Sequence, residues 1–311
     1  FLTMNEKIHI ACGQNGEYTD AGSSGALVAG HGGTFVVTQN NDPLIIVGGG
    51  SGANYSTHTN KKSNGHSILT KFIMKTEQWA VAPSTDQSGN DYRTDGFGGS
   101  SSGTSDQGYG QSGGGFNTNA WGNGDGISAR GWANGLKGGI SNQGNKANGG
   151  FGGGGASWTN DGHRAGGGGG YSGGRGAFYT NKGGAGAGGS AYHRKKVYNF
   201  TPGKPYSGPG KVIVKYVGGF LPKDTGLYSF GSFTFRTETK GADGPTLETL
   251  KQLYKDTKWT QSDKFLSMNP KRPGIQIWTV PKTGNYKFEV HGAGGNDAGY
   301  LGGYKSGYSR K

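Results

Sequence analysis

The sequence predicts a mainly β fold with an ordered glycine-rich region and one short α-helix. Three observations carry this prediction. Short runs of β-branched residues lie between Gly, Asn and Asp turns near both ends, 68 of the 311 residues are glycine, and 12% are aromatic. Disordered segments are usually poor in aromatic residues, so a chain with this many rings is expected to bury them. A hydrophobic fraction of only 30% excludes an ordinary core along the whole chain.

Residues 1–47 are predicted to form short strands. The runs "EKIHIAC", "TFVVTQ" and "DPLIIVGG" carry β-branched residues between turn-forming residues. Cys12 follows the first run and is the only cysteine, which excludes an internal disulfide framework and a cysteine-based zinc site. We expect Cys12 to be a small buried hydrophobe, the alternative being pairing between molecules.

Glycine dominates from about residue 48 to residue 190, interrupted by "HSILTKFIMKTEQWAVAP" (66–83). The region has no strict G-x-y repeat, which excludes a collagen triple helix, and it lacks the composition of a flexible linker. The remaining ordered state is a bundle of polyproline-II-like helices that hydrogen-bond side by side. Only glycine allows such close approach. We therefore expect residues 97–190 to be ordered, and Gly167, Gly168 and Gly169 to have no room for a side chain.

Three tryptophans, Trp121, Trp132 and Trp158, lie within this region. We expect them to flank the glycine bundle and seal it from water. The alternative is that they are exposed and stack on sugars, because an indole combines a large apolar surface with a polar N–H group.

Strand patterns return from "KVIVKYV" (211–217) onward, in "GLYSFGSFTFRTET", "IQIWTV" and "NYKFEVHG". Trp278 alternates with isoleucines and is expected in the core or on the sheet surface. Between these runs, "PTLETLKQLYKD" (245–256) predicts a helix, and Pro245 suits its entry. The residues on its predicted buried face are Leu247, Leu250, Leu253 and Tyr254.

Motifs for catalysis are missing from the sequence. There is no GxxxxGK[ST] and no HExxH, and the few acidic residues have no spacing that suggests acid–base chemistry. The histidines show no metal-ligand spacing, and His291 is expected to be structural. They are His9, His31, His58, His66, His163, His193 and His291. We predict a protein that is not an enzyme and that uses no cofactor and no metal.

The formal net charge is +13, and the basic residues are scattered, with the densest runs at 193–196 and 269–272. A nucleic-acid partner is not expected, because it would require cations and stacking aromatics on one surface. Anionic glycans, an acidic cell surface or simple solubility explain the charge. No run approaches the ~20 apolar residues of a membrane helix, and no signal peptide is recognised. We expect an extracellular, secreted product with no transmembrane segment.

Two candidate glycosylation sequons and one candidate processing site occur. Asn54 and Asn199 each begin an N-x-[ST] sequence, although Pro202 makes the second a poorer acceptor. Arg310 and Lys311 form a dibasic pair that fits a processing cut or an ordinary basic tail.

The run "GIQIWTVPKTGNYKFEVHGAGG" (274–295) closely resembles the opening of the glycine-rich domain of the anaplastic lymphoma kinase and leukocyte tyrosine kinase receptors. Residues 233–246 resemble the segment that precedes it there. "CGQNGE", "DPLIIVGGGSG", "GFGGGGAS…GGGGGYSGG" and "GPGKVIVKY" are similar to later parts of that domain. The resemblance implies a tumour-necrosis-factor-like β-sandwich with an inserted bundle of polyglycine helices.

The order of these parts differs from the family. There, the part like 233–303 comes first and "FLTMNEKIHIACGQNGE" follows it; here the first part is last. The chain also lacks the paired cysteines, growth-factor-like module, membrane helix and kinase of those receptors. Residues 1–218 are expected to hold sandwich strands and the glycine bundle. Residues 219–311 would complete a sandwich, either of the same chain or of a neighbour. A third account makes the chain one unit released from a tandem array.

The sequence therefore favours a non-enzymatic, secreted structural protein that assembles with itself, head to tail into fibres, with residues 217–226 as hinge. The alternative is an extracellular binding module, an adhesin or a receptor-like ectodomain that recognises a glycan or protein.

Overall fold

The computed structural model describes most of the chain. The described residues are 1–20, 26–54, 72–75, 78–81, 96–99, 110–121, 126–142, 144–159, 163–176, 192–193, 208–219, 226–294, 297–298 and 304–305.

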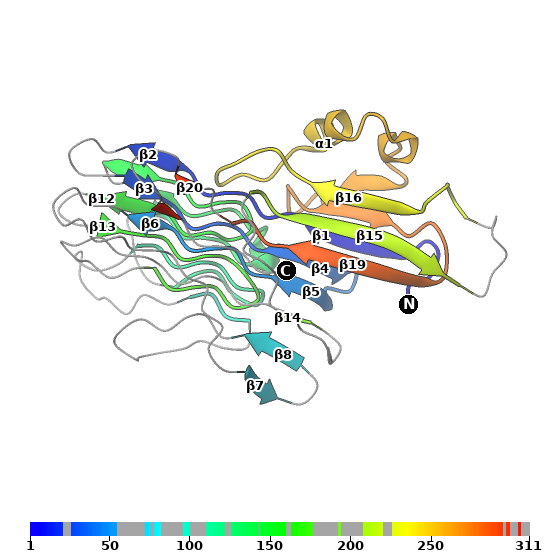
Figure 1. Cartoon of the computed structure of the whole chain (residues 1–311), viewed down its shortest axis with the longest axis horizontal. Coiled ribbons are helices and arrows are strands. Elements are labelled where there is room, and N and C mark those ends of the chain that lie inside the picture. Colours follow the sequence, from blue (N-terminus) through cyan, green and yellow to red (C-terminus); the bar gives the residue numbers. More distant parts are fainter. Residues whose placement is uncertain are drawn as a thin grey trace.

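The fold is mainly β, with antiparallel sheets and one short α-helix, as predicted (Figure 1). The largest sheet has eight strands. In sheet order they are β17 (Leu266–Met268), β18 (Gln276–Thr279), β1 (Lys7–Ala11), β4 (Thr34–Thr38), β5 (Pro43–Val47), β14 (Tyr192–His193), β8 (Gln78–Val81) and β7 (Phe72–Lys75).

A second, three-stranded sheet and several small sheets make up the rest of the β structure in the described residues. The second sheet has the order β16 (Ser232–Arg236), β15 (Lys211–Gly218) and β19 (Asn285–His291). The small sheets are β2 (Tyr18–Asp20) with β3 (Ala26–Val28) and β6 (Ala53–Asn54); β11 (Asn145–Ala147) with β12 (Ser157–Thr159) and β13 (His163–Arg164); β9 (Gly126–Ile127) with β10 (Ile140–Ser141); and β20 (Asp297–Ala298) with β21 (Tyr304–Lys305).

Strands β1 and β4 of the large sheet are buried on both faces. Alternate residues of a strand point to opposite faces, and Ile8 and Ile10 of β1 enter a core that they share with Val212 and Val214 of β15. The intervening positions on the other side, including Ala11, belong to a second apolar cluster with Phe35, Val37, Ile46, Trp132, Leu136, Phe151 and Ile275. Burial on both faces explains why β4 is a nearly continuous apolar run instead of an alternating one.

Glycine segments connect strands of the large sheet to the small sheets at the far end of the molecule. Residues 29–33 link β3 to β4, and residues 48–52 link β5 to β6. They lie side by side with other segments in what we call the glycine bundle (Figure 1). The bundle comprises residues 13–17, 29–33, 48–52, 96–99, 110–115, 148–156 and 165–176.

Hydrogen bonding in the glycine bundle extends in several directions, unlike the two-neighbour pattern of a sheet. The N–H groups of Gly30, His31 and Gly32 donate to three different segments, at Gly155, Gly50 and Gln14 respectively. The next N–H, of Gly33, donates again to 148–156, at the carbonyl of Gly152. The direction of donation therefore recurs every third residue.

The same three-residue recurrence appears in three further segments. In each, residues i and i+3 donate to one common neighbour: Gln111 and Gly114 to 148–156, Gly167 and Gly170 to 110–115, and Gly49 and Gly52 to 165–176. In these segments too, the direction in which the N–H groups donate recurs every third residue.

The glycines are required by space. A Cβ on Gly32 would lie 1.7 Å from the carbonyl oxygen of Phe151, and one on Gly30 would lie 2.0 Å from that of Gly167. For Gly167 and Gly169 the nearest carbonyl oxygens would be 2.1 and 1.9 Å away. The prediction that Gly167 and Gly169 have no room for a side chain is confirmed. Gly168 is buried beside them and accepts a hydrogen bond from the N–H of Gly174.

The helix α1 (Leu247–Leu253) forms where the sequence predicts one. Thr246 caps it, since its hydroxyl accepts a hydrogen bond from the N–H of Thr249. Pro245 precedes the cap instead of occupying the first helical position. Leu250 and Tyr254 are buried in the core, as predicted for that face. Two 3₁₀ turns are also described, η2 (Trp132–Asn134) and η3 (Lys258–Gln261).

We predict that Gly32→Ala destabilises the protein by about 3 kcal/mol or more, because a methyl group would force two backbone segments apart. The matched control is Gly231→Ala, where a Cβ would meet nothing within 4 Å and the change should stay within about 0.5 kcal/mol. Chemical denaturation of both variants measures the difference. Equal stabilities of the Gly32→Ala and Gly231→Ala variants would show that the backbone around Gly32 shifts to make room for a methyl group at little cost.

Candidate functional site

The candidate site is the junction between residues 226–294 and the preceding chain. β15 is the central strand of its sheet, and both neighbours, β16 and β19, come from residues 226–294 (Figure 1). β18 from the same segment pairs with β1 in the large sheet. Within the described residues, β15 pairs with no strand outside this segment. All these pairings are made within one chain.

The 226–294 segment carries its own aromatic cluster. The ring of Phe233 lies 4.8 Å from that of Trp259 and 5.0 Å from that of Tyr254. The indole N–H of Trp278 donates to the hydroxyl of Tyr228 over 2.8 Å. Further rings of the segment in contact with these are Phe230, Phe235, Phe265 and Tyr286. All these ring contacts join residues of the same segment.

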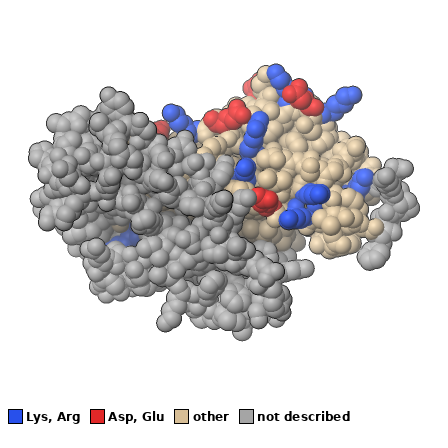
Figure 2. All heavy atoms as spheres, in the orientation of Figure 1, with Lys and Arg blue, Asp and Glu red and all other residues tan. Residues whose placement is uncertain are grey.

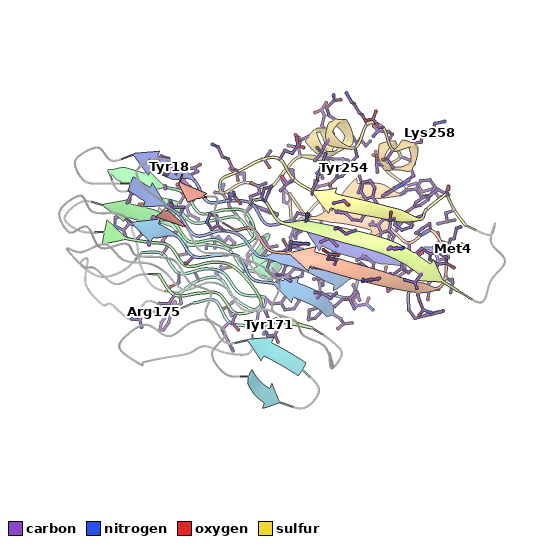
Figure 3. The ribbon with its side chains drawn as sticks, in the orientation of Figure 1. Met4, Tyr18, Tyr171, Arg175, Tyr254 and Lys258 are labelled. Atoms are coloured by element: carbon purple, nitrogen blue, oxygen red, sulfur yellow. The ribbon has the colours of Figure 1, made fainter. Side chains whose placement is uncertain are left out.

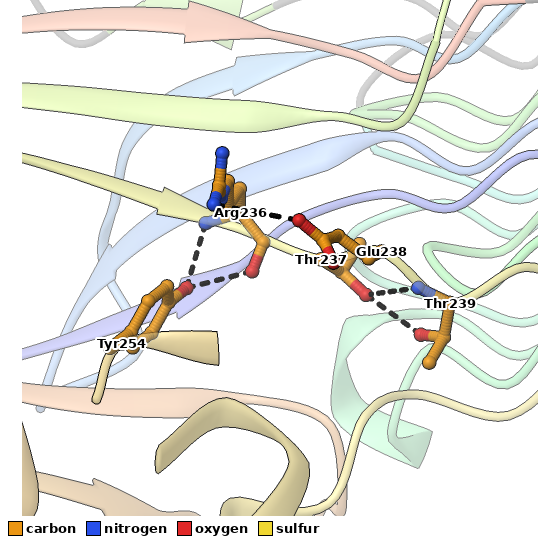
Figure 4. Close-up of polar contacts among 5 residues, drawn as sticks. All are labelled: Arg236, Thr237, Glu238, Thr239 and Tyr254. Carbon is orange, nitrogen blue, oxygen red and sulfur yellow. Dashed lines mark hydrogen bonds and ion pairs between the residues drawn. The ribbon is translucent and has the colours of Figure 1, made fainter. Parts of the chain in front are cut away.

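Tyr254 fastens α1 to the end of β16. Its hydroxyl accepts a hydrogen bond from the N–H of Arg236 over 2.8 Å and donates to the carbonyl of the same residue over 2.7 Å (Figure 4). The side-chain oxygen of Gln276 lies 3.3 Å from the same hydroxyl. Burial raises the pKa of Tyr254, so the phenol stays protonated and keeps its donor.

The 226–294 segment also enters the glycine bundle. The N–H of Gly241 donates to the carbonyl of Asn15 over 3.0 Å, and its own carbonyl accepts from Phe151 over 2.7 Å. The buried amide of Gln14 donates to the hydroxyl of Thr239 over 2.6 Å. Backbone complementarity therefore extends from the sheets into the bundle.

Arg272 joins three parts of the chain at one point. Its guanidinium lies 4.8 Å from the ring of Trp132 and donates to the side-chain oxygen of Asn41 over 2.9 Å. The indole N–H of Trp132 donates to the same oxygen over 3.2 Å. A cation on an indole face is favourable, so this contact holds the β4–β5 turn, η2 and the 226–294 segment together.

A stack of four rings closes the glycine bundle against the large sheet. Phe35 stacks on Trp132 with ring centres 5.7 Å apart, Trp132 on Phe116 at 5.9 Å, and Phe116 on Tyr171 at 6.1 Å. Tyr171 marks the outer end of the stack (Figure 3). These rings supply the apolar burial that glycine cannot.

His31 is a buried histidine inside the glycine bundle. Its Nδ1 accepts a hydrogen bond from the N–H of Gly16 over 3.1 Å, and its Nε2 is buried without a hydrogen-bond partner in the structure. Burial lowers the pKa of His31 to about 4. The ring is therefore neutral at physiological pH.

The burial of several side chains agrees with the prediction from the sequence. Cys12 is buried in the core, and burial raises the pKa of its thiol, which keeps it unreactive. Trp278 is fully buried, and His291 is buried with Nε2 2.9 Å from the carboxylate of Glu289. Trp132 and Trp158 are buried, whereas 64% of Trp121 is exposed. The sugar-stacking alternative thus stays open only at Trp121.

Of the four predicted modification residues, the structure describes only Asn54. Asn54 ends β6, where it pairs with Leu27 of β3. Asn199, Arg310 and Lys311 lie outside the described residues, so their glycosylation and processing stay predictions.

The described part of the chain has neither a metal-binding cluster nor a membrane-spanning helix. No three His, Cys, Asp or Glu side chains there are grouped so that they could hold a metal ion. None of the helices that the structure describes has the length and apolar character needed to cross a bilayer.

The sequence did not reveal the roles of Tyr254, Arg272 and His31. Helical spacing placed Tyr254 on a buried face, but its hydroxyl contact depends on where β16 ends. Arg272 lay in a basic run without a visible partner, and His31 was one histidine among glycines.

Comparison with known proteins gives no relative: no family model, no curated protein and no solved structure matches this chain.

We predict that acid destabilises the protein through His31. Its folded-state pKa of about 4 lies below the ordinary 6.5, so the unfolded chain takes up the proton first. The contribution of His31 is complete above pH 6.5 and is lost as the pH falls toward 4, amounting to about 3 kcal/mol at most. His31→Asn keeps an acceptor for Gly16 but cannot titrate. The unfolding free energy should fall more between pH 7 and pH 4.5 for the wild type than for this variant. An equal fall in the two proteins would contradict the prediction.

We predict that Tyr254→Phe lowers the unfolding free energy by about 1–3 kcal/mol, because both backbone groups of Arg236 lose their partner while the ring stays packed. The matched control is Tyr18→Phe, at a tyrosine that is half exposed. Thermal unfolding measures both. A Tyr254→Phe protein as stable as the control would show that water replaces the hydroxyl without cost.

Proposed function

We propose that this chain is a non-enzymatic, secreted structural protein that assembles with copies of itself. Assembly proceeds by exchange: the 226–294 segment of one copy completes the sheets of the next, head to tail, and forms fibres. Its principal partner is itself, and its location is extracellular.

The observation that carries this proposal is the dependence of β15 on strands from the 226–294 segment. Residues 1–219 place Val212 and Val214 in the core, so a copy of the segment must cover them. The segment brings its own aromatic cluster, the bonds of Tyr228 and Tyr254, and the cation of Arg272. It is therefore suited to transfer as one unit.

The connection to the segment also supports exchange. Val217 is 63% exposed, and Gly218 has a φ of +138° with nothing within 4 Å of a Cβ. Gly218 is the last residue of β15, opposite Asn285 and next to an irregularity in the register, and as a glycine it lets the chain change direction there. Residues 220–225 of the predicted hinge lie outside the described residues.

The finer architecture belongs to the same proposal. We take the glycine segments to be polyproline-II-like helices, since their direction of donation recurs every third residue and that helix has three residues per turn. Two antiparallel sheets that share one core support a tumour-necrosis-factor-like sandwich. Both agree with the resemblance to the glycine-rich domain of the kinase receptors, with its segments in permuted order.

One observation favours a second function, an extracellular binding module. Trp121 and Phe97 are exposed by 64% and 40%. Phe97 belongs to the glycine bundle, and Trp121 lies next to it, where its N–H donates to the carbonyl of Gly99. Exposed rings of this kind can stack on a glycan or grip a protein.

We predict that Lys215→Cys/Lys287→Cys chains form a ladder of covalent oligomers on mild oxidation. The two positions are directly opposite on β15 and β19, where the Cα separation of about 4.5–5.5 Å suits a disulfide. Exchange places the two cysteines on different chains, so non-reducing electrophoresis should resolve the ladder. The single variants are the controls. A monomer with an internal disulfide as the sole product would show that each chain closes on itself and would refute exchange.

A further inference from the structure

The outer face of the β16–β15–β19 sheet carries four cations, Lys211, Lys215, Arg236 and Lys287, and one carboxylate, Glu289. Val212 and Val214 point into the core, so the alternating residues of β15 point outward. The register places these outward residues in rows across the sheet. The first row holds Arg236, Lys211 and His291; the second holds Thr234, Ile213 and Glu289; the third holds Ser232, Lys215 and Lys287.

Two of these rows place like charges directly opposite each other. Lys211 is opposite Arg236, and Lys215 is opposite Lys287. Like charges at such positions destabilise a sheet. Arg236 has an exposed partner in Glu238 at 3.5 Å, whereas Lys215 and Lys287 have no ion pair within the described residues.

Three of the four cations on this face are exposed to solvent, whereas His291 in the first row is buried. Lys215, Arg236 and Lys287 are all exposed. Figure 2 looks onto this side of the molecule, and basic side chains lie over the region of β15, β16 and β19. Within a strand, Lys211 and Lys215 are roughly 13 Å apart at about 3.3 Å per residue, and neighbouring strands are about 4.8 Å apart.

We propose that this face binds a linear anionic polysaccharide that crosses the strands and contacts Lys211, Lys215, Arg236 and Lys287. Charge complementarity selects a polyanion. The ring of His291 is buried and the other outward positions in these rows carry no aromatic ring on which bases could stack, which disfavours single-stranded nucleic acid. They carry no Trp, Phe or Leu to enter a lipid interface, which disfavours a membrane surface.

The inference does not rest on self-assembly. The same three strands form the face whether β16 and β19 come from one chain or from a neighbour. Light scattering reports the oligomeric state independently, so failure of one proposal leaves the other intact.

The test uses the full chain with dextran sulfate as probe and uncharged dextran as its matched control polymer. Lys215→Gln/Lys287→Gln should weaken the affinity for dextran sulfate about tenfold at 0.15 M salt. Lys255→Gln/Lys258→Gln removes the same charge at exposed positions near α1 and should change the affinity less than about twofold. Neither chain should bind uncharged dextran.

Thermal unfolding supplies a second readout. Without polymer, Lys215→Gln/Lys287→Gln should melt at a higher temperature than the wild type, because the repulsion is removed. Dextran sulfate should raise the melting temperature of the wild type more than that of this variant. Equal losses of affinity in the two double variants would show a diffuse charge effect and overturn the proposal. Tighter binding to oligo-dT or to phosphatidylserine vesicles than to dextran sulfate would overturn the choice of polysaccharide.

Discussion

The close approach of glycine backbones is the constraint on which the rest of the structure depends. Carbonyl oxygens occupy the positions where Cβ atoms of neighbouring segments would be, as at Gly32 and Gly30. The glycine bundle is therefore rich in hydrogen bonds and contributes little apolar burial. Since ordering each glycine costs more backbone entropy than ordering other residues, the stabilising burial has to come from elsewhere.

That burial is concentrated beside the bundle. Trp132, Phe116 and Tyr171 extend the apolar contacts of the large sheet outward, while the aromatic cluster of residues 226–294 fills the space between the two sheets. The segment thus combines hydrophobic free energy with main-chain complementarity, two contributions that are normally spread over a whole domain. This combination makes one segment decisive for the fold.

The sequence predicted the helix and the longer strands, β1, β4, β5, β15, β16, β18 and β19, because strand and helical patterns are local properties; it did not predict the short strands of the small sheets. The burial of Cys12 and Trp278 and the tight packing of Gly167 and Gly169 could be predicted for the same reason. Each follows from the residue type and its neighbours in the sequence. The contacts at the junction could not. Arg272 meets Asn41 only because the β4–β5 turn and the loop before β18 come together in three dimensions. The two bonds of Tyr254 depend on where β16 ends relative to the end of α1. The hydrogen-bond directions of the glycine bundle likewise depend on the number of neighbours, which no single segment encodes.

The hydroxyl of Tyr254 has a consequence for how copies of this protein could meet in solution. An edge strand with free N–H and C=O groups is a template for unplanned pairing and aggregation. The side of β16 that faces away from β15 is such an edge, and the phenol occupies both main-chain groups of Arg236 there. A side chain thus blocks the end of this edge strand, at Arg236. This leaves fewer backbone groups to which strands of unrelated molecules could add.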